Sequence, residues 1–218
     1  MATNWQWAAG AVLVSVTAFP AHAGEGDLDP ARRTLVVRTY NRFGVSARDL
    51  STAEATAGQL FEDIGIRVVW MDCGSGGHQL ASLTAHCDEV VTAAEVILRI
   101  CAAGPGDERE SASMGFALVS SDATGVAVLA TVFADRVLDV ARVAGVDPRP
   151  LLGRAIGHEL GHLLLSTDAH AAIGLMRAKW SQVELRRTSP ADWRFLDTEA
   201  HVIQDAVTRR IASALPKR

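Results

Sequence analysis

The sequence lacks an excess of positive charge. It contains 21 Lys and Arg residues against 25 Asp and Glu residues, which gives a net charge of −4. Proteins that bind nucleic acid or anionic membranes usually carry a basic surface, so we expect neither partner. Internal repeats and low-complexity segments are also lacking, and the 218-residue length suits one hydrophobic core better than two.

Charge is missing altogether from the beginning of the chain. No charged side chain precedes Glu25, and Ala8–Phe19 is a mostly apolar run that is too short to span a bilayer. Residues 21–23, Ala-His-Ala, then form the small-x-small pattern of a signal-peptidase site. We therefore expect residues 1–23 to be a signal peptide and residues 24–218 to be a single domain, secreted or periplasmic. An uncleaved membrane anchor and an ordinary buried segment are the alternatives.

Cysteine is scarce, with Cys73, Cys87 and Cys101 only. Disulfides persist outside the cytosol, and the first two cysteines bracket a loop rich in Gly, Ser and His. The simplest interpretation is a Cys73–Cys87 disulfide with Cys101 buried outside it. The sequence leaves the other pairings open, and also a Cys/His zinc site with His78 and His86, whose spacing matches no common zinc pattern.

Short apolar runs rich in β-branched residues indicate strands. Five are predicted, at residues 35–40, 66–71, 96–101, 115–120 and 126–133. A strand, a helix and a second strand open the series, which is the usual source of a parallel pair. We expect an α+β fold with a mixed, mostly parallel sheet of about five strands, a helix that carries the active site and a C-terminal helix.

Helical periodicity and capping residues predict helices over residues 46–64, 135–144 and 147–165, and a last helix that ends near Leu215. The first helix turns its apolar positions toward the core; these are Leu50, Ala53, Ala57, Leu60, Phe61 and Ile64. Asp135 is the expected N-cap of the second helix, and Gly145 ends it. The last helix has two candidate starts, at Ser189-Pro190 and at Thr198-Glu199.

The residues that carry chemistry lie on the helix over 147–165. His158 and His162 are four positions apart, so both imidazoles lie on one helical face, where one zinc ion can bind two nitrogens. Glu159 lies about 100° around the helix, beside the metal, where a carboxylate can act as a general base. Gly153, Gly157 and Gly161 form a bare stripe along the same helix, which predicts close packing by the sheet or the terminal helix.

Two histidines leave a zinc site incomplete, and three residues can supply the third ligand. They are His170, Asp168 and Glu184. The helical segment resembles the zincin metallopeptidases. In the metzincin branch the third ligand follows ten residues after the first, which is the position of Asp168 here. The gluzincin branch uses a Glu on a following helix, for which Glu184 is a loose match.

A closer resemblance is to a group of secreted bacterial proteins with the motif HEIGHLLLG, a His, and then Gly-Ile-Met-Arg. This chain has HELGHLLLS at 158–166, then His170, and GLMR at 174–177. The similarity extends to the Cys73/Cys87 loop and to residues 115–118 and 132–137. It implies His170 as the third zinc ligand, with Asp168 as the alternative. It also implies Met176 as the methionine of a Met-turn beneath the zinc; ordinary core packing is the other interpretation of Met176. Ser166 stands where the motif has a turn Gly.

Together these features predict a secreted zinc metallopeptidase that hydrolyses peptide bonds. His158, His162 and His170 would hold Zn²⁺, Glu159 would be the general base, and a peptide would be the substrate. The resemblance also implies an exposed strand beside the site, for which residues 115–120 are the candidate. A catalytically inactive secreted domain that binds zinc is the alternative, and an anchored envelope protein is a third possibility. Tyr40 is the single tyrosine and is far from the motif in sequence, so no oxyanion donor is predicted.

Overall fold

The computed structural model describes residues 33–74, 87–104, 113–119, 128–187 and 189–214. The predicted signal peptide, His78, His86 and the turn predicted at 121–125 lie outside the described residues. Within those ranges, no helix combines the length and apolar character needed to cross a membrane.

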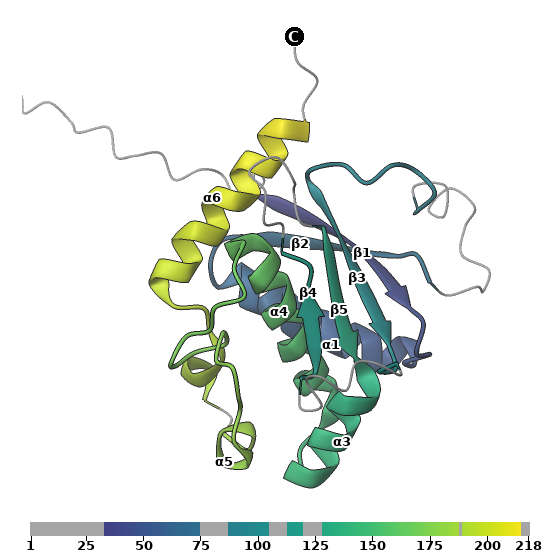
Figure 1. The fold of residues 1–218 in the computed structure, drawn as a ribbon, viewed down its shortest axis with the longest axis vertical. Coiled ribbons are helices and arrows are strands. Elements are labelled where there is room, and N and C mark those ends of the chain that lie inside the picture. The colour runs from purple at the N-terminus through teal and green to yellow at the C-terminus, as the bar shows by residue number, and fades with distance from the viewer. Residues whose placement is uncertain (1–32, 75–86, 105–112, 120–127, 188, 215–218) are drawn as a thin grey trace, which may run out of the picture.

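A five-stranded sheet forms the centre of the fold (Figure 1). Its strands are β1 (Thr34–Asn41), β2 (Arg67–Asp72), β3 (Glu95–Cys101), β4 (Gly115–Ala117) and β5 (Leu129–Phe133). The order across the sheet is β2-β1-β3-β5-β4. All neighbours pair in parallel except β4, which is antiparallel to β5 and forms one edge. The predicted mixed, mostly parallel sheet is therefore confirmed.

The first helix, α1 (Ala47–Glu62), begins as its sequence predicts. Ser46 is the N-cap, and its side chain accepts a hydrogen bond from the backbone N–H of Asp49. Five of the six predicted core positions are buried, and Ile64 is half-buried. Gly65 follows with a φ of 71°, a left-handed conformation that glycine adopts without strain.

The helix α3 (Ala134–Ala144) ends at left-handed Gly145, as predicted, but its N-cap prediction is wrong. Phe133 occupies the cap position and makes no side-chain capping bond. The Asp135 carboxylate instead accepts hydrogen bonds from the backbone N–H of Ala103, at 3.0 and 3.2 Å. This contact ties the start of α3 to the segment that follows β3.

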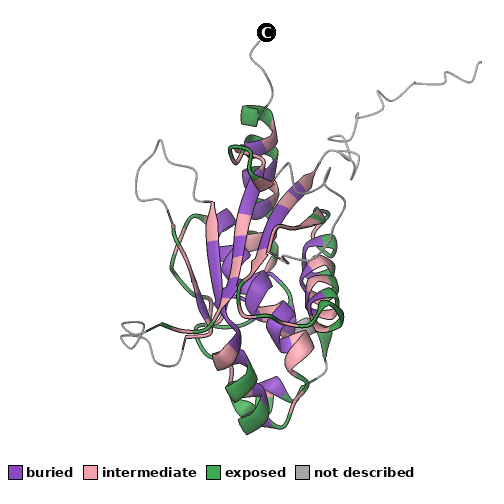
Figure 2. Ribbon diagram, turned by 90° about the vertical axis from the view of Figure 1, so that its right-hand side faces the viewer, coloured by how far each residue is buried: buried purple, intermediate pink, exposed green. Residues whose placement is uncertain are grey.

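The central helix α4 (Pro148–Leu165) starts at Asp147, whose side chain accepts a hydrogen bond from the backbone N–H of Arg149. It is the most enclosed helix, buried from Leu151 to Leu164 except at Arg154 (Figure 2). The glycine stripe allows its close packing, but the partners are α1 at Gly153 and Gly157, and Met176 and Phe195 at Gly161, rather than the sheet or the terminal helix. A β-carbon at Gly153 would meet Thr56 of α1, and one at Gly157 would meet Leu60.

The C-terminal part consists of helices joined by short loops. It contains α5 (Gln182–Leu185), the 3-10 helix η4 (Pro190–Trp193) and α6 (Asp197–Ala214). Both candidate starts of the last helix are used, because η4 forms at the first and α6 begins one residue before the second. The segment between α4 and α6 lies beside the second half of α4 and completes the site described below.

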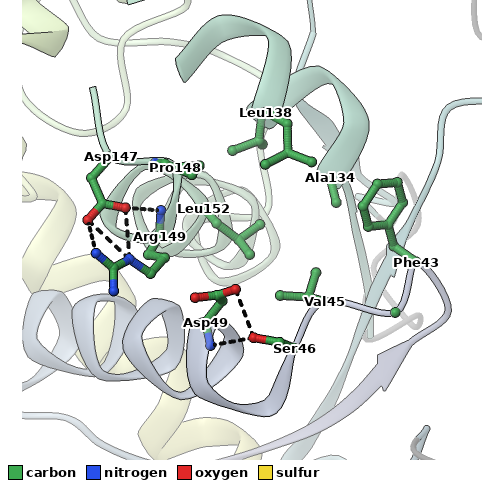
Figure 3. A pocket seen from close by; sticks show the side chains of 12 residues that line it. Phe43, Val45, Ser46, Asp49, Ala134, Leu138, Asp147, Pro148, Arg149 and Leu152 are labelled. Carbon is green, nitrogen blue, oxygen red and sulfur yellow. Dashed lines mark hydrogen bonds and ion pairs between the residues drawn. The ribbon is translucent and has the colours of Figure 1, made fainter. Parts of the chain in front are cut away.

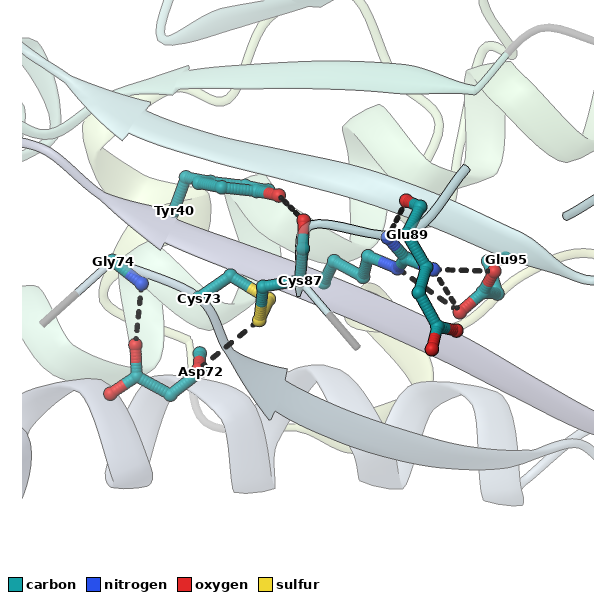
Figure 4. Close-up of a disulfide and its surroundings, with 8 residues drawn as sticks. Tyr40, Asp72, Cys73, Gly74, Cys87, Glu89 and Glu95 are labelled. Carbon is teal, nitrogen blue, oxygen red and sulfur yellow. Dashed lines mark hydrogen bonds and ion pairs between the residues drawn. A yellow bond between two sulfur atoms is a disulfide. The ribbon is translucent and has the colours of Figure 1, made fainter. Parts of the chain in front are cut away.

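The predicted Cys73–Cys87 disulfide is present, with a Cα–Cα distance of 5.6 Å (Figure 4). It joins the end of β2 to the segment that leads into β3. Cys101 stands outside the bridge and is half-buried rather than buried. Nearby, the buried guanidinium of Arg38 on β1 pairs with both carboxylate oxygens of Glu95 and donates to the carbonyl oxygen of Glu89. These contacts fix the 87–95 segment to the sheet.

Candidate metal centre

Three imidazole rings converge at the C-terminal half of α4. His158 and His162 lie one turn apart on the helix, and their Nε2 atoms are 3.0 Å apart. The Nε2 atom of His170 lies 3.3 Å from that of His162. One nitrogen from each ring lies within 4.8 Å of the other two, which is an arrangement that could hold a metal ion. The structure therefore brings together the three histidines singled out from the sequence.

The turn that brings His170 back to the helix is made by Ser166. This residue has a φ of 53°, a left-handed conformation that is uncommon for a side chain other than Gly or Asn. Its backbone N–H donates to the carbonyl oxygen of His162. Ser166 thus makes the helix-ending turn at the position where glycine was expected, and the chain brings His170 to the other two histidines.

The Nδ1 contacts of His158 and His162 determine the protonation of their Nε2 atoms, which face the centre of the cluster. His158 Nδ1 lies 2.9 Å from the carbonyl oxygen of Leu175, and His162 Nδ1 lies 2.8 Å from that of Thr167. A carbonyl oxygen can only accept, so each Nδ1 carries the hydrogen and each Nε2 presents a lone pair. Such carbonyl contacts typically orient histidines that bind a metal.

The lone pairs on His158 Nε2 and His162 Nε2 repel each other at 3.0 Å, and a cation between the two nitrogens would remove this repulsion. A proton is disfavoured, because burial lowers the pKa of His158 to about 4 and also lowers the pKa of His162. Nitrogens that share one tetrahedral zinc ion lie about 3.4 Å apart, close to the spacing found here. The residues present therefore fit a metal ion bound by three imidazole nitrogens.

Glu159 lies on α4 next to the first histidine and is 6% exposed. Its carboxylate reaches the edge strand β4, where a β-carbon at Gly115 would lie 2.9 Å from Oε1. Gly115 therefore provides the space that the carboxylate occupies. The arrangement places a carboxylate between the histidine-bearing helix and the edge of the sheet.

The segment 174–176 packs against α4 beside His158 and Gly161. Gly174 has a φ of 80°, and the turn directs the carbonyl oxygen of Leu175 to His158. Met176 is 1% exposed, and a β-carbon at Gly161 would lie 2.6 Å from its Sδ. The Met176 side chain thus packs against α4 at Gly161, next to His162, and its assignment as a Met-turn methionine stays a prediction.

Asp168 and Glu184, the alternative third ligands, are not part of the histidine cluster. Glu184 forms a capping box with Ser181 and an ion pair with Arg177. The negative charge of Asp168 acts on His162 by favouring its protonated form, but its oxygens are not grouped with the ring nitrogens. His201 is exposed on α6, where its Nδ1 lies 2.6 Å from the carbonyl oxygen of Asp197.

An aromatic wall next to the histidines was not predicted from the sequence. The Trp180 ring meets the His158 ring edge-on at a centroid distance of 5.7 Å, and meets the Trp193 ring at 5.1 Å. Trp180 also lines a cavity of about 290 Å³ with Val140, Val143 and Leu185. Tryptophan content alone gave no signal for this wall, because its members are separated in sequence and meet only in the fold.

A second cavity, larger than the one that Trp180 lines, lies elsewhere. It measures about 560 Å³ and lies between the β1–α1 loop and the starts of α3 and α4 (Figure 3). Its charged groups already have partners, since Arg149 pairs with Asp147 and the Asp49 carboxylate accepts from Ser46. None of the three histidines lines it. We therefore assign the chemistry to the histidine centre and not to the larger cavity.

Comparison with known proteins establishes the fold. No protein-family profile matches the chain, and no curated protein sequence does so either. Among solved structures, the chain is similar to archaemetzincin from Methanopyrus kandleri, with a TM-score of 0.51 and 19% identity over 84% of this chain and 99% of that one. It is also similar to a zinc-dependent peptidase from Methanocorpusculum labreanum, with a TM-score of 0.50 and 12% identity over 77% and 99%. The chain therefore has a fold similar to that of archaemetzincin.

Proposed function

We propose that the protein is a secreted zinc metallopeptidase with a single catalytic domain. The observation that carries the proposal is the convergence of three imidazoles beside a buried carboxylate, on a fold similar to archaemetzincin. His158, His162 and His170 would hold the ion. The second structural neighbour is described as zinc-dependent, and imidazole nitrogens at this spacing suit zinc.

Held by His158, His162 and His170, a zinc ion would supply Lewis-acid chemistry, polarising a carbonyl oxygen and lowering the pKa of a bound water molecule to about 7. Glu159 is placed to take a proton from water and to pass it to the leaving amine, because its carboxylate lies between α4 and β4. Burial of His158, Glu159 and His162 lowers the local dielectric constant and strengthens these interactions. Leu175 and Thr167 hold the imidazoles in the tautomer that binds the metal.

The peptide substrate would bind along β4. Among the described strands, β4 pairs with β5 alone, so its other edge could hydrogen-bond to an extended peptide. Gly115 brings that edge next to Glu159. A peptide added to β4 would therefore place a scissile bond near both the carboxylate and the histidine centre.

Digestion of a diverse peptide pool by the purified protein tests the proposal. We expect cleavage that a zinc chelator abolishes and added zinc restores. A protein that binds zinc tightly and cleaves nothing would instead be a zinc-binding domain without turnover. For secretion, mass spectrometry of the exported protein should find Gly24 as the first residue; a retained Met1 in membrane fractions would favour an anchored protein.

A further inference from the structure

Arg154 is an exception within the central helix. From Leu151 to Leu164 every residue of α4 is buried except Arg154, which is half-buried. It precedes His158 by four positions, so the two side chains lie on the same face, one turn of about 6 Å apart. The one α4 side chain in this stretch that reaches toward solvent therefore neighbours the metal centre.

The guanidinium of Arg154 stacks on an aromatic ring and has no anionic partner within the described part of the chain. Its Cζ lies 3.9 Å from the centroid of the Trp193 ring. Among the residues that the structure describes, Arg154 forms no ion pair or hydrogen bond. Arg177 lies over the same ring at 5.7 Å, but its charge is balanced by Glu184. Only one of the two guanidinium groups at Trp193 is thus neutralised by the protein.

This arrangement leaves the charge of Arg154 partly desolvated and uncompensated. Burial lowers the pKa of the Arg154 guanidinium, which nevertheless stays protonated at neutral pH. A ring face attracts a cation, but it accepts no N–H···O hydrogen bond. Stacking by its flat face leaves the N–H groups at the edge of a guanidinium able to bind both oxygens of a carboxylate.

The stack is connected directly to the histidine centre. The Trp180 ring contacts Trp193 at 5.1 Å and His158 at 5.7 Å, so the aromatic pair joins the guanidinium to the first histidine. An extended peptide advances about 3.3 Å per residue. A peptide that runs from the centre across the Trp180–Trp193 pair would therefore bring a group a few residues from the scissile bond to Arg154.

We propose that Arg154 determines specificity by binding a carboxylate of the peptide substrate, close to the bond that is cleaved. The inference rests on the proposed peptidase function for its setting. The carboxylate can be the side chain of Glu or Asp, or the C-terminal carboxylate of a short peptide. Both sources present the same planar group with two oxygens, and the guanidinium fork matches that group in either case.

Binding is measured with labelled alanine hexapeptides on the zinc-loaded Glu159→Gln protein, so that turnover does not interfere. One series carries Glu or Gln at each position in turn, and each peptide is made with a free or an amidated C-terminus. At one position, we expect the peptide with Glu to have a dissociation constant at least 10-fold lower than the peptide with Gln. Alternatively, the peptide with a free C-terminus should have a dissociation constant at least 10-fold lower than its amidated form. The first result assigns an acidic side chain, and the second assigns the C-terminal carboxylate.

Variants attribute the preference to this residue. Arg154→Met keeps an apolar stem on Trp193 and should reduce the ratio to about one, whereas Arg154→Lys keeps the charge and should retain part of it. Arg209→Met, on the exposed face of α6, removes the same charge elsewhere and should leave the ratio unchanged. A ratio near one in the parent protein, or an unchanged ratio in Arg154→Met, would overturn the inference. An Arg154-dependent preference without cleavage of any peptide by wild type would instead sink only the peptidase proposal.

Discussion

Gly115 on β4 packs directly against the carboxylate of Glu159 on α4. A β-carbon at this glycine would lie 2.9 Å from both Oε1 and Cγ of Glu159, and it would also meet the carbonyl oxygen of Thr131. The distance between β4 and α4 therefore leaves room for the Glu159 carboxylate only because position 115 has no side chain. The absence of a side chain at one strand position defines where the proposed general base can lie.

Replacing Gly115 with alanine should displace the carboxylate. We expect hydrolysis to fall about 10- to 100-fold, since small displacements of a positioned group have effects of this size. Crowding should also lower the free energy of unfolding by about 1–3 kcal/mol, while zinc content is retained. The matched control is Gly58→Ala on α1, where the nearest atom is Trp70 Nε1 at 3.6 Å. A folded Gly115→Ala protein with wild-type hydrolysis would contradict the spacing argument.

Replacing His170, Asp168 and Glu184 one at a time should show which of them is the third zinc ligand. His170→Ala removes a nitrogen that lies 3.3 Å from His162 Nε2, so zinc affinity should fall by more than about 100-fold, the upper range for changes in outer-shell partners. Asp168→Ala and Glu184→Gln should leave zinc affinity nearly unchanged. Competition with a chelator of known affinity gives the three values. Loss of zinc from Asp168→Ala alone would exchange the assignments.

The sequence predicted most elements of the fold because their signals are local. Ser46, Gly65 and Gly145 mark helix ends through their own side chains or backbone freedom. The Asp135 prediction failed because its carboxylate accepts from Ala103, a partner 32 residues away. The glycine stripe was recognised, but its partner was assigned to the wrong element, since periodicity shows a packing face and not what covers it.

For the site, the sequence singled out the residues of one motif and missed its surroundings. His158, Glu159 and His162 follow from helical spacing, and His170 was named from a resemblance. Nothing in the sequence placed Trp180 or Trp193 against the motif helix, because these contacts depend on how the segment after the Met176 turn folds back. The contact of Gly115 with Glu159 is of the same kind, since it joins positions that are adjacent only once β4 pairs with β5.

Glu54 provides a pH-dependent test of the fold outside the metal centre. Burial, followed by the nearby charge of Asp72, raises the pKa of Glu54 to about 7, although Thr39 donates a hydrogen bond to its carboxylate. The folded state therefore holds a proton that the unfolded state releases. This contribution to stability is fully present below about pH 4.5 and is lost as the pH rises through 7.

The variant Glu54→Gln should consequently be more stable than wild type at pH 8, by on the order of 1 kcal/mol after allowance for solvent screening. The difference should shrink as the pH falls to 5. Chemical denaturation at both pH values measures it, and Glu62→Gln on the exposed face of the same helix is the control. A stability difference that does not change with pH would show that Glu54 is ionised throughout this range.

The Cys73–Cys87 disulfide should contribute substantially to stability. It closes a loop with a sequence separation of 14, for which the expected contribution is about 3 kcal/mol. The double variant Cys73→Ser/Cys87→Ser should unfold at a lower temperature, and a reducing agent should lower the midpoint of wild type in the same way. Cys101→Ala should keep the bridge. Peptide mapping that finds Cys101 in a disulfide would refute this pairing.

The hydrolysis rate of Glu159→Gln, with zinc content measured on the same sample, tests the central claim most directly. Glutamine keeps the size and position of the side chain but cannot accept a proton from water. The account predicts one zinc ion per chain, an unchanged fold and a rate at least about 100-fold below wild type. Wild-type hydrolysis by the zinc-loaded Glu159→Gln protein would contradict the proposed role of this carboxylate, even if the three histidines do bind the metal.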